Sequence, residues 1–195
     1  NGLLAYDRKL VKVDLEMVAK ANKGNFKGIP EPVTLLKDAR NGPQDWRYTT
    51  KRPTEGWMKK DFDDSSWSKG QSGFGSRGTP GARIGTEWTN NEIWLRREFP
   101  LPADLGGTWI LTCHHDEDVE IYINGVLAAK ATGFTGDYEE LEVSSEAAKT
   151  LRNHGNVIAV QCRQTRGGQF IDVGLIVVPT GANARPGEPK IPSKP

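Results

Sequence analysis

The chain has 195 residues, enough for one sizeable domain with appendages. Its 26 basic and 25 acidic side chains nearly cancel, which argues against a nucleic-acid or anionic-membrane partner. No apolar run approaches the roughly 20 residues that a membrane span requires. The 22 glycines, 12 prolines and 6 tryptophans are typical of a turn-rich β domain.

Residues 1–31 differ in character from the rest of the chain. Asp14 is a suitable cap for a short helix whose apolar face would contain Leu15, Val18 and Ala19. Gly24 follows as a plausible stop. The sequence therefore predicts a helical or irregular lead-in segment that packs on the domain or on a preceding one.

The β domain is expected over residues 32–178. Its first strands are predicted at 33–36 and 46–50, and the glycine-rich segment 53–90 is expected to be mostly irregular. Loops of this length are uncommon in compact domains unless they serve a function.

A dense series of strands should follow this segment. Alternating apolar and polar residues predict strands at 93–99, 109–113, 119–123, 126–131, 138–143, 157–162 and 170–178. Asn124-Gly125 supplies the two positive-φ residues of a tight type I′ hairpin. Cys113 and Cys162 lie within this series and are expected to be buried small hydrophobes, with a disulfide as the alternative.

The end of the chain completes the predicted organisation. Ser144 can cap a short helix over 146–151, and residues 179–195 form a Pro/Gly-rich tail or linker whose composition cannot support a core. About eight short strands at near-regular spacing predict an all-β sandwich or jelly roll.

Several fragments occur in an order that points to a known family. They are Trp57 with Asp61 to Trp67, Gly73-Phe74-Gly75, Ile93 to Phe99, His115 to Asp118 leading to Tyr122 to Gly125, and Gly155 to Val160. Together they resemble the sugar-binding jelly-roll domain of glycoside hydrolase family two enzymes, the β-galactosidase and β-glucuronidase-like group, within the galactose-binding-domain-like superfamily. The resemblance covers residues 32–178, roughly.

This resemblance implies a galactose-binding-like β-sandwich that works as a module of a larger secreted bacterial enzyme. The expected partners are an oligo- or polysaccharide and the neighbouring catalytic domain of the parent enzyme. The chain alone is not expected to be an enzyme, because the family's reacting carboxylates lie in a separate barrel domain. A periplasmic or extracellular location is implied by the resemblance only, since the chain shows no signal-peptide pattern.

Carbohydrate binding favours flat aromatic side chains beside polar groups, because sugar rings present apolar C–H faces. Trp57 and Trp88 lie in the irregular segment, and Trp88, with Asn90 close by, is the best stacking candidate. The alternative is that Trp88 packs the long loop onto the sandwich.

The stretch from His114 to Asp118 is the densest polar cluster in the sequence. On a strand, His114 and His115 point to opposite faces, so both cannot easily serve one metal. His115 and Asp118 are candidate ligands for sugar hydroxyls. Asp116 and Asp118 could bind calcium, a cofactor that such domains often carry, although Asp116 also suits an acidic turn without any ligand.

Arg163 and Arg166 flank the Gly167-Gly168 turn and suit the rim of a ligand site. Asp172 lies between apolar residues of a late strand and needs a buried partner, for which Arg96 or Arg97 is the expected choice.

Two other functions stay open. The sandwich could be a structural interdomain or protein-interaction module without sugar binding, which an exposed apolar patch would favour. A stand-alone hydrolase would need two carboxylates facing each other in one cleft, and the adjacent Asp63 and Asp64 are more typical of a turn.

Overall fold

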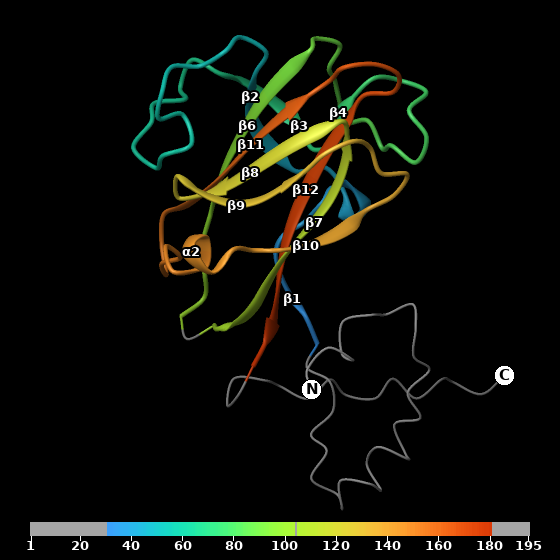
Figure 1. Cartoon of the computed structure of the whole chain (residues 1–195). Coiled ribbons are helices and arrows are strands. Elements are labelled where there is room, and N and C mark those ends of the chain that lie inside the picture. Colours follow the sequence, from blue (N-terminus) through green and yellow to red (C-terminus); the bar gives the residue numbers. More distant parts are fainter. Residues whose placement is uncertain (1–30, 104, 181–195) are drawn as a thin grey trace, which may run out of the picture.

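The computed structural model describes residues 31–103 and 105–180, which form two sheets of six strands each (Figure 1). The first sheet has the order β10-β7-β12-β4-β5, and β1 also pairs with β12. Its strands are β1 (Val33–Leu36), β4 (Phe74–Gly75), β5 (Thr86–Glu87), β7 (Gly107–Asp116), β10 (Glu139–Glu142) and β12 (Phe170–Pro179). The second sheet has the order β3-β2-β6-β11-β8-β9. Its strands are β2 (Asp45–Thr49), β3 (Ser68–Gln71), β6 (Glu92–Phe99), β8 (Asp118–Ile123), β9 (Val126–Ala131) and β11 (Asn156–Arg163).

This architecture confirms the predicted all-β sandwich. Three short strands, β3, β4 and β5, lie within the segment that the sequence predicted to be mostly irregular. They escape prediction because each has only two to four residues. Their pairing also depends on distant segments: β3 pairs with β2, and β4 pairs with β12.

The hydrophobic core lies between the two sheets, and strict alternation along the strands fills it. Ile171, Val173 and Leu175 of β12 belong to the same buried cluster as Ile158 and Val160 of β11. Full burial of each such aliphatic side chain stabilises the fold by about 1.5–3 kcal/mol. Cys113 and Cys162 are also fully buried in this core as free thiols, and burial raises the pKa of both.

The β8–β9 hairpin forms as the Asn-Gly pair predicts. Asn124 has a φ of 51° and Gly125 a φ of 88°, the two left-handed residues of a type I′ turn. The Asn124 side chain also binds the neighbouring strand: its Oδ1 accepts from the Val157 N–H at 2.9 Å, and its Nδ2 donates to Asn156 Oδ1 at 3.0 Å. The turn residue therefore fixes both the hairpin and its register against β11.

Two short helical segments connect the strands. α2 (Ser145–Ala148) begins at Ser144, whose hydroxyl accepts from the Ala147 N–H at 3.2 Å, so the predicted cap is confirmed. The 3-10 turn η2 (Ala39–Asn41) begins at Asp38. Within the described residues, no helix is long and apolar enough to cross a membrane.

The predicted boundaries of the lead-in, the β domain and the tail stay predictions. The helical lead-in over 1–31 lies almost wholly outside the described residues, as does the tail over 179–195.

A loop segment, residues 50–67, covers much of the outer face of the second sheet. Trp57 and Trp67 pack there against Trp94 of β6 and Ala159 of β11, forming a second buried cluster. Arg96 lies beneath this cover, where its guanidinium donates to the Lys59 carbonyl at 3.0 Å and to the Trp57 carbonyl, and pairs with Asp64 at 2.8 Å. The cover leaves one end of this face open.

Candidate functional site

Side chains of β6, β11 and β8 form rows across the outer face of the second sheet, because the three strands are neighbours in register. Arg163 of β11 lies opposite Glu92 of β6 on one side and Asp118 of β8 on the other. In the next row, Gln161 lies between Trp94 and Glu120. Because side chains alternate between the two faces of a strand, these rows lie on the same outer face and bring charged groups of neighbouring strands side by side.

Two adjoining hollows lie over these rows, with volumes of about 370 Å³ and about 300 Å³. They share Arg52, Gln161 and Arg163, so we treat them together as the polar groove. The first hollow is completed by Asn91, Glu92 and Gln164, and the second by Asp118, Val119 and Glu120.

Hydrogen bonds fix the floor and rim of the polar groove. Gln161 Nε2 donates to Glu92 Oε1 at 3.1 Å, and the Gln164 N–H donates to the Asn91 carbonyl at 2.7 Å. Arg163 Nε lies 3.9 Å from Glu92 Oε1 and its side chain is 61% exposed. An ion pair of that length and exposure contributes little, so the Arg163 guanidinium remains able to donate to a ligand.

The inner end of the polar groove rests on the aromatic cluster beneath the loop cover. Tyr122 donates its hydroxyl hydrogen bond to Glu120 Oε2 at 2.5 Å, and its ring meets that of Trp57 edge to face at 5.7 Å between centroids. Burial, followed by the bond to Glu120, raises the pKa of Tyr122 to about 12. Glu120 is therefore held by a neutral donor at any ordinary pH.

Of the candidates from the sequence, Arg163 and Asp118 are brought together in the polar groove. Asn90 and Arg166 are exposed on the adjacent loops but do not line it, and the Asn90 carbonyl accepts from Gln169 Nε2 at 2.5 Å. Sequence reasoning missed Arg52 and Gln161. The alternation of β11 could have found Gln161, because it shares the outward face with Arg163.

Trp57 and Trp88 occupy places that do not suit a stacking platform. Trp88 is 2% exposed and belongs to the core between the sheets, and Trp57 is 7% exposed under the loop cover. A sugar ring needs an open aromatic face, so the expected stacking role is wrong for both in this structure. The alternative, that Trp88 packs its loop onto the sandwich, is correct.

His115 also lies away from the polar groove. It is on β7 of the first sheet, it is 1% exposed, and its Nε2 shares a hydrogen bond with Glu139 Oε1 at 2.8 Å. The expected contact with sugar hydroxyls is therefore wrong, because no face of the imidazole reaches solvent.

The candidate calcium ligands are separated by their surroundings. Asp116 is buried, and burial raises the pKa of its carboxyl, whereas Asp118 Oδ1 accepts from the Gly133 N–H at 3.2 Å. Among the residues described, no group of three or more His, Cys, Asp or Glu side chains is arranged to hold a metal ion. Calcium binding stays a prediction.

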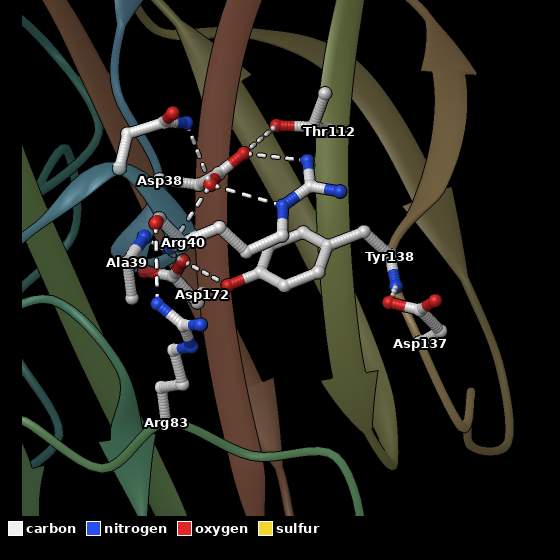
Figure 2. Close-up of polar contacts among 9 residues, drawn as sticks. Asp38, Ala39, Arg40, Arg83, Thr112, Asp137, Tyr138 and Asp172 are labelled. Atoms are coloured by element: carbon white, nitrogen blue, oxygen red, sulfur yellow. Dashed lines mark hydrogen bonds and ion pairs between the residues drawn. The ribbon is translucent and has the colours of Figure 1, made fainter. Parts of the chain in front are cut away.

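A second polar cluster, rich in hydrogen bonds, lies on the first sheet and is shown in Figure 2. Asp172 of β12 accepts from the Ala39 N–H at 2.6 Å, the Gly73 N–H at 3.1 Å and the Tyr138 hydroxyl at 2.5 Å. The expected pairing with Arg96 or Arg97 is wrong: Asp172 receives backbone amides instead. Burial is the main cause that raises the pKa of Asp172.

Asp38 completes this cluster from the start of η2. Its carboxylate accepts from Arg40 Nη2 and from the Thr112 hydroxyl, both at 2.8 Å, and Arg40 also lies over the Tyr138 ring at 3.8 Å (Figure 2). Burial raises the pKa of Asp38, but its bonds to Arg40 and Thr112 outweigh burial and lower it overall. Because protein donors occupy the acceptors of both carboxylates, the cluster attaches loops to the sheet rather than offering atoms to a ligand.

Comparisons with known proteins bear on the fold. No protein-family model and no curated protein sequence matches the chain. A glycosyl hydrolase family 2 member from Bacteroides cellulosilyticus superposes with a TM-score of 0.51 and 17% identity, over 74% of this chain and 20% of its own. A β-glucuronidase of glycoside hydrolase family 2 superposes with a TM-score of 0.50 and 18% sequence identity, over 75% of this chain and 18% of its own. The β-glucuronidase of Bacteroides uniformis superposes with a TM-score of 0.51 and 18% sequence identity, over 76% of this chain and 18% of its own.

These likenesses confirm the resemblance in fold that the sequence motifs indicated. At such low identity they establish shared architecture rather than shared residues. The chain spans about a fifth of the length of the enzymes it matches. It has the fold of one domain of glycoside hydrolase family 2 enzymes.

Proposed function

We propose that the chain is a non-catalytic carbohydrate-binding accessory module of a glycoside hydrolase, and that the polar groove is its binding site. The observation that carries the proposal is the row Glu92–Arg163–Asp118 beside Gln161, exposed on a sandwich whose fold occurs within such enzymes. Carboxylates accept hydrogen bonds from sugar hydroxyls, and guanidinium and amide groups donate to hydroxyl and ring oxygens.

The shape of the groove supports binding that is specific but weak. Its two hollows are open and polar, so much of a bound sugar would remain in contact with water. Such a site gains little beyond the entropy lost on association, and we expect dissociation constants near the millimolar range. An accessory module offsets weak binding because it is tethered to its enzyme, which raises the effective concentration of substrate.

Catalysis by this chain alone is disfavoured by the same geometry. Arg163 stands between Glu92 and Asp118, so these two carboxylates do not face each other across a cleft that excludes water. Turnover of a glycoside by the isolated chain would overturn the proposal.

An interdomain or protein-interaction role is the alternative, and Phe134 favours it because its side chain is 74% exposed. The other large hydrophobic residues that are exposed in the described segments are Val33 and Leu127, which are only about half as exposed. The three lie on different elements: β1, β9 and the loop after β9. A docking face needs a contiguous apolar patch, which this distribution does not supply.

Three further parts of the proposal rest on the resemblance. The partner in the same protein would be a catalytic domain, the location would be periplasmic or extracellular, and bound calcium would be an optional structural addition. Cell fractionation tests the location. A change in melting temperature on adding calcium, reversed by a chelator, tests the metal.

The experiment that tests the proposal measures glycan binding by the full chain at millimolar concentration. Glycan arrays should identify a ligand, and calorimetry should show that Gln161→Ala removes binding, because this residue lies in both hollows. Arg166→Ala is the matched control, since it removes an exposed side chain outside the groove. The proposal fails if no glycan binds, or if Gln161→Ala binds as well as the wild type.

A further inference from the structure

The polar groove contains no aromatic side chain among the residues that line it. Val119 is the one apolar residue in this lining, and its side chain belongs to the buried core and is 1% exposed. A neutral sugar would therefore find hydrogen bonds but no flat surface for its C–H face. Hydrogen bonds between a neutral sugar and these groups largely replace bonds to water, so a neutral sugar gains little from the groove.

Charge is distributed unevenly between the two hollows. Arg52 and Arg163 line both, whereas the acids are divided: Glu92 lines the first hollow, and Asp118 and Glu120 line the second. Because both hollows share the same two arginines, the groove as a whole has two guanidinium groups and three carboxylates. Of the three carboxylates, Glu92 alone lies at the end beside Asn91 and Gln164, so this is the less acidic end of the groove.

The acids near the arginines are partly engaged elsewhere. Glu92 accepts the Gln161 amide at 3.1 Å and lies 3.9 Å from Arg163, too far for a hydrogen bond. Glu120 is engaged by the Tyr122 hydroxyl at 2.5 Å. Arg52 is exposed and has neither a hydrogen-bond acceptor nor an ion-pair partner for its side chain within the described part of the chain.

We propose that the polar groove selects a negatively charged sugar, with the carboxylate of a uronic acid or a sulfate group held between Arg52 and Arg163. Guanidinium groups bind such oxyanions through two parallel hydrogen bonds, which are stronger than neutral ones. The hydroxyls of the same sugar would then lie toward Asp118 and Glu120. This inference rests on the proposed function, because it names the ligand class of the same groove.

The test uses pairs of probes in which the negative charge is masked or removed while the sugar ring is kept. Calorimetry with the full chain should show that oligogalacturonides bind about tenfold more tightly than their methyl esters, which keep the ring and remove the charge. A sulfated oligosaccharide and its desulfated form make the second arm. The arm that shows the larger difference identifies the acidic group.

Charge-removing variants locate the site. Arg52→Gln and Arg163→Gln should each weaken binding of the acidic probe about tenfold and leave binding of the ester unchanged. Arg166→Gln removes the same charge outside the groove and should bind like the wild type. All three side chains are exposed, so melting temperatures should match and exclude misfolding.

The possible results separate this inference from the proposed function. If charged and uncharged probes bind equally, selection by charge is wrong while carbohydrate binding stands. If Arg166→Gln weakens binding as much as Arg163→Gln, the attraction is general and the assignment to the groove is wrong. If none of these probes binds but the array identifies another glycan, the ligand class is wrong and the proposed function stands; if no glycan binds at all, both proposals fail.

Discussion

The outer faces of the two sheets are both covered by loops, but opposite chemical groups hold the two covers. On the second sheet, the cation Arg96 donates to carbonyls of the segment 50–67. On the first sheet, the anions Asp38 and Asp172 accept N–H groups from the turn η2 and from Gly73. Each buried charge matches the type of backbone group that its loop leaves unpaired.

The contrast shows how a loop without regular structure can be fixed on a sheet. Loop backbone groups that turn inward must find partners, because an unpaired buried N–H or C=O is costly. A guanidinium offers only donors, and a carboxylate offers only acceptors. One arginine can therefore organise two carbonyls and a carboxylate of one loop, and one aspartate can organise amides from two loops.

The polar groove exists because one cover stops short. The row containing Arg96, Ala159 and Tyr122 lies under the segment 50–67, as does Trp94 in the next row. The row containing Arg163 is beyond the packed part of the cover, and Arg52, near the start of the segment 50–67, lines the groove there. The groove is thus the uncovered end of a face that is otherwise part of the packing.

The largest loss in the free energy of unfolding should come from removing Arg96, the cation that holds the segment 50–67 on the second sheet. Arg96→Ala leaves the carbonyls of Trp57 and Lys59 and the Asp64 carboxylate without their donor, and we expect a loss of about 3–5 kcal/mol in the free energy of unfolding. Arg47→Ala is the matched control, because Arg47 donates to the Trp67 carbonyl at 3.2 Å from a more exposed place. Chemical denaturation measures both. Equal losses would contradict a special role for Arg96.

Removing Asp172, which holds loops on the first sheet, should lower the free energy of unfolding less than removing Arg96, and the loss should depend on pH. Asp172→Ala leaves two amides and the Tyr138 hydroxyl unpaired, which should cost about 2–4 kcal/mol, and Asp172→Asn should cost less. Burial raises the pKa of Asp172 above its ordinary 3.8, so at pH values between 3.8 and the raised pKa the folded state holds a proton that the unfolded state has lost. The stability contribution of Asp172 therefore falls as pH rises through this range, above which the carboxylate is ionised in both states.

Denaturation over a pH series separates this effect from packing. The free energy of unfolding of the wild type, relative to that of Asp172→Asn, should decrease as pH rises from about 4 upward. A difference that does not change with pH would mean that Asp172 has an unperturbed pKa, and that its role is only geometric.

The smallest loss in the free energy of unfolding is expected at Arg40, which lies at the edge of the cluster around Asp38 and Asp172. Arg40→Gln removes an ion pair with Asp38 whose arginine side chain is 44% exposed, so the loss should be about 1 kcal/mol or less. Arg40→Lys should not restore the wild-type value fully, because lysine cannot bind both carboxylate oxygens through a planar fork. A loss as large as that of Asp172→Ala would place the main attachment at Arg40 instead.

Local patterns predicted the strands outside the segment 53–90, the Asn124-Gly125 turn and the Ser144 cap, because each depends on residues close together in the chain. The misplaced candidates have a common cause. Trp88 and His115 were judged from loop position and neighbouring polar residues, but burial depends on which distant segment lies above a residue. Asp172 was given an arginine partner, because nothing local identifies a backbone N–H that is 133 residues away in sequence, that of Ala39.

The sequence by itself determined the all-β architecture, since alternation and turn chemistry act over a few residues. It also singled out Arg163, directly after one predicted strand, and Asp118, directly before another, as candidate ligand residues. Only the tertiary structure decided that these two become neighbours, because β11 lies between β6 and β8 in the sheet, an order unlike that in the chain. The same long-range order left their row uncovered, and so produced the groove.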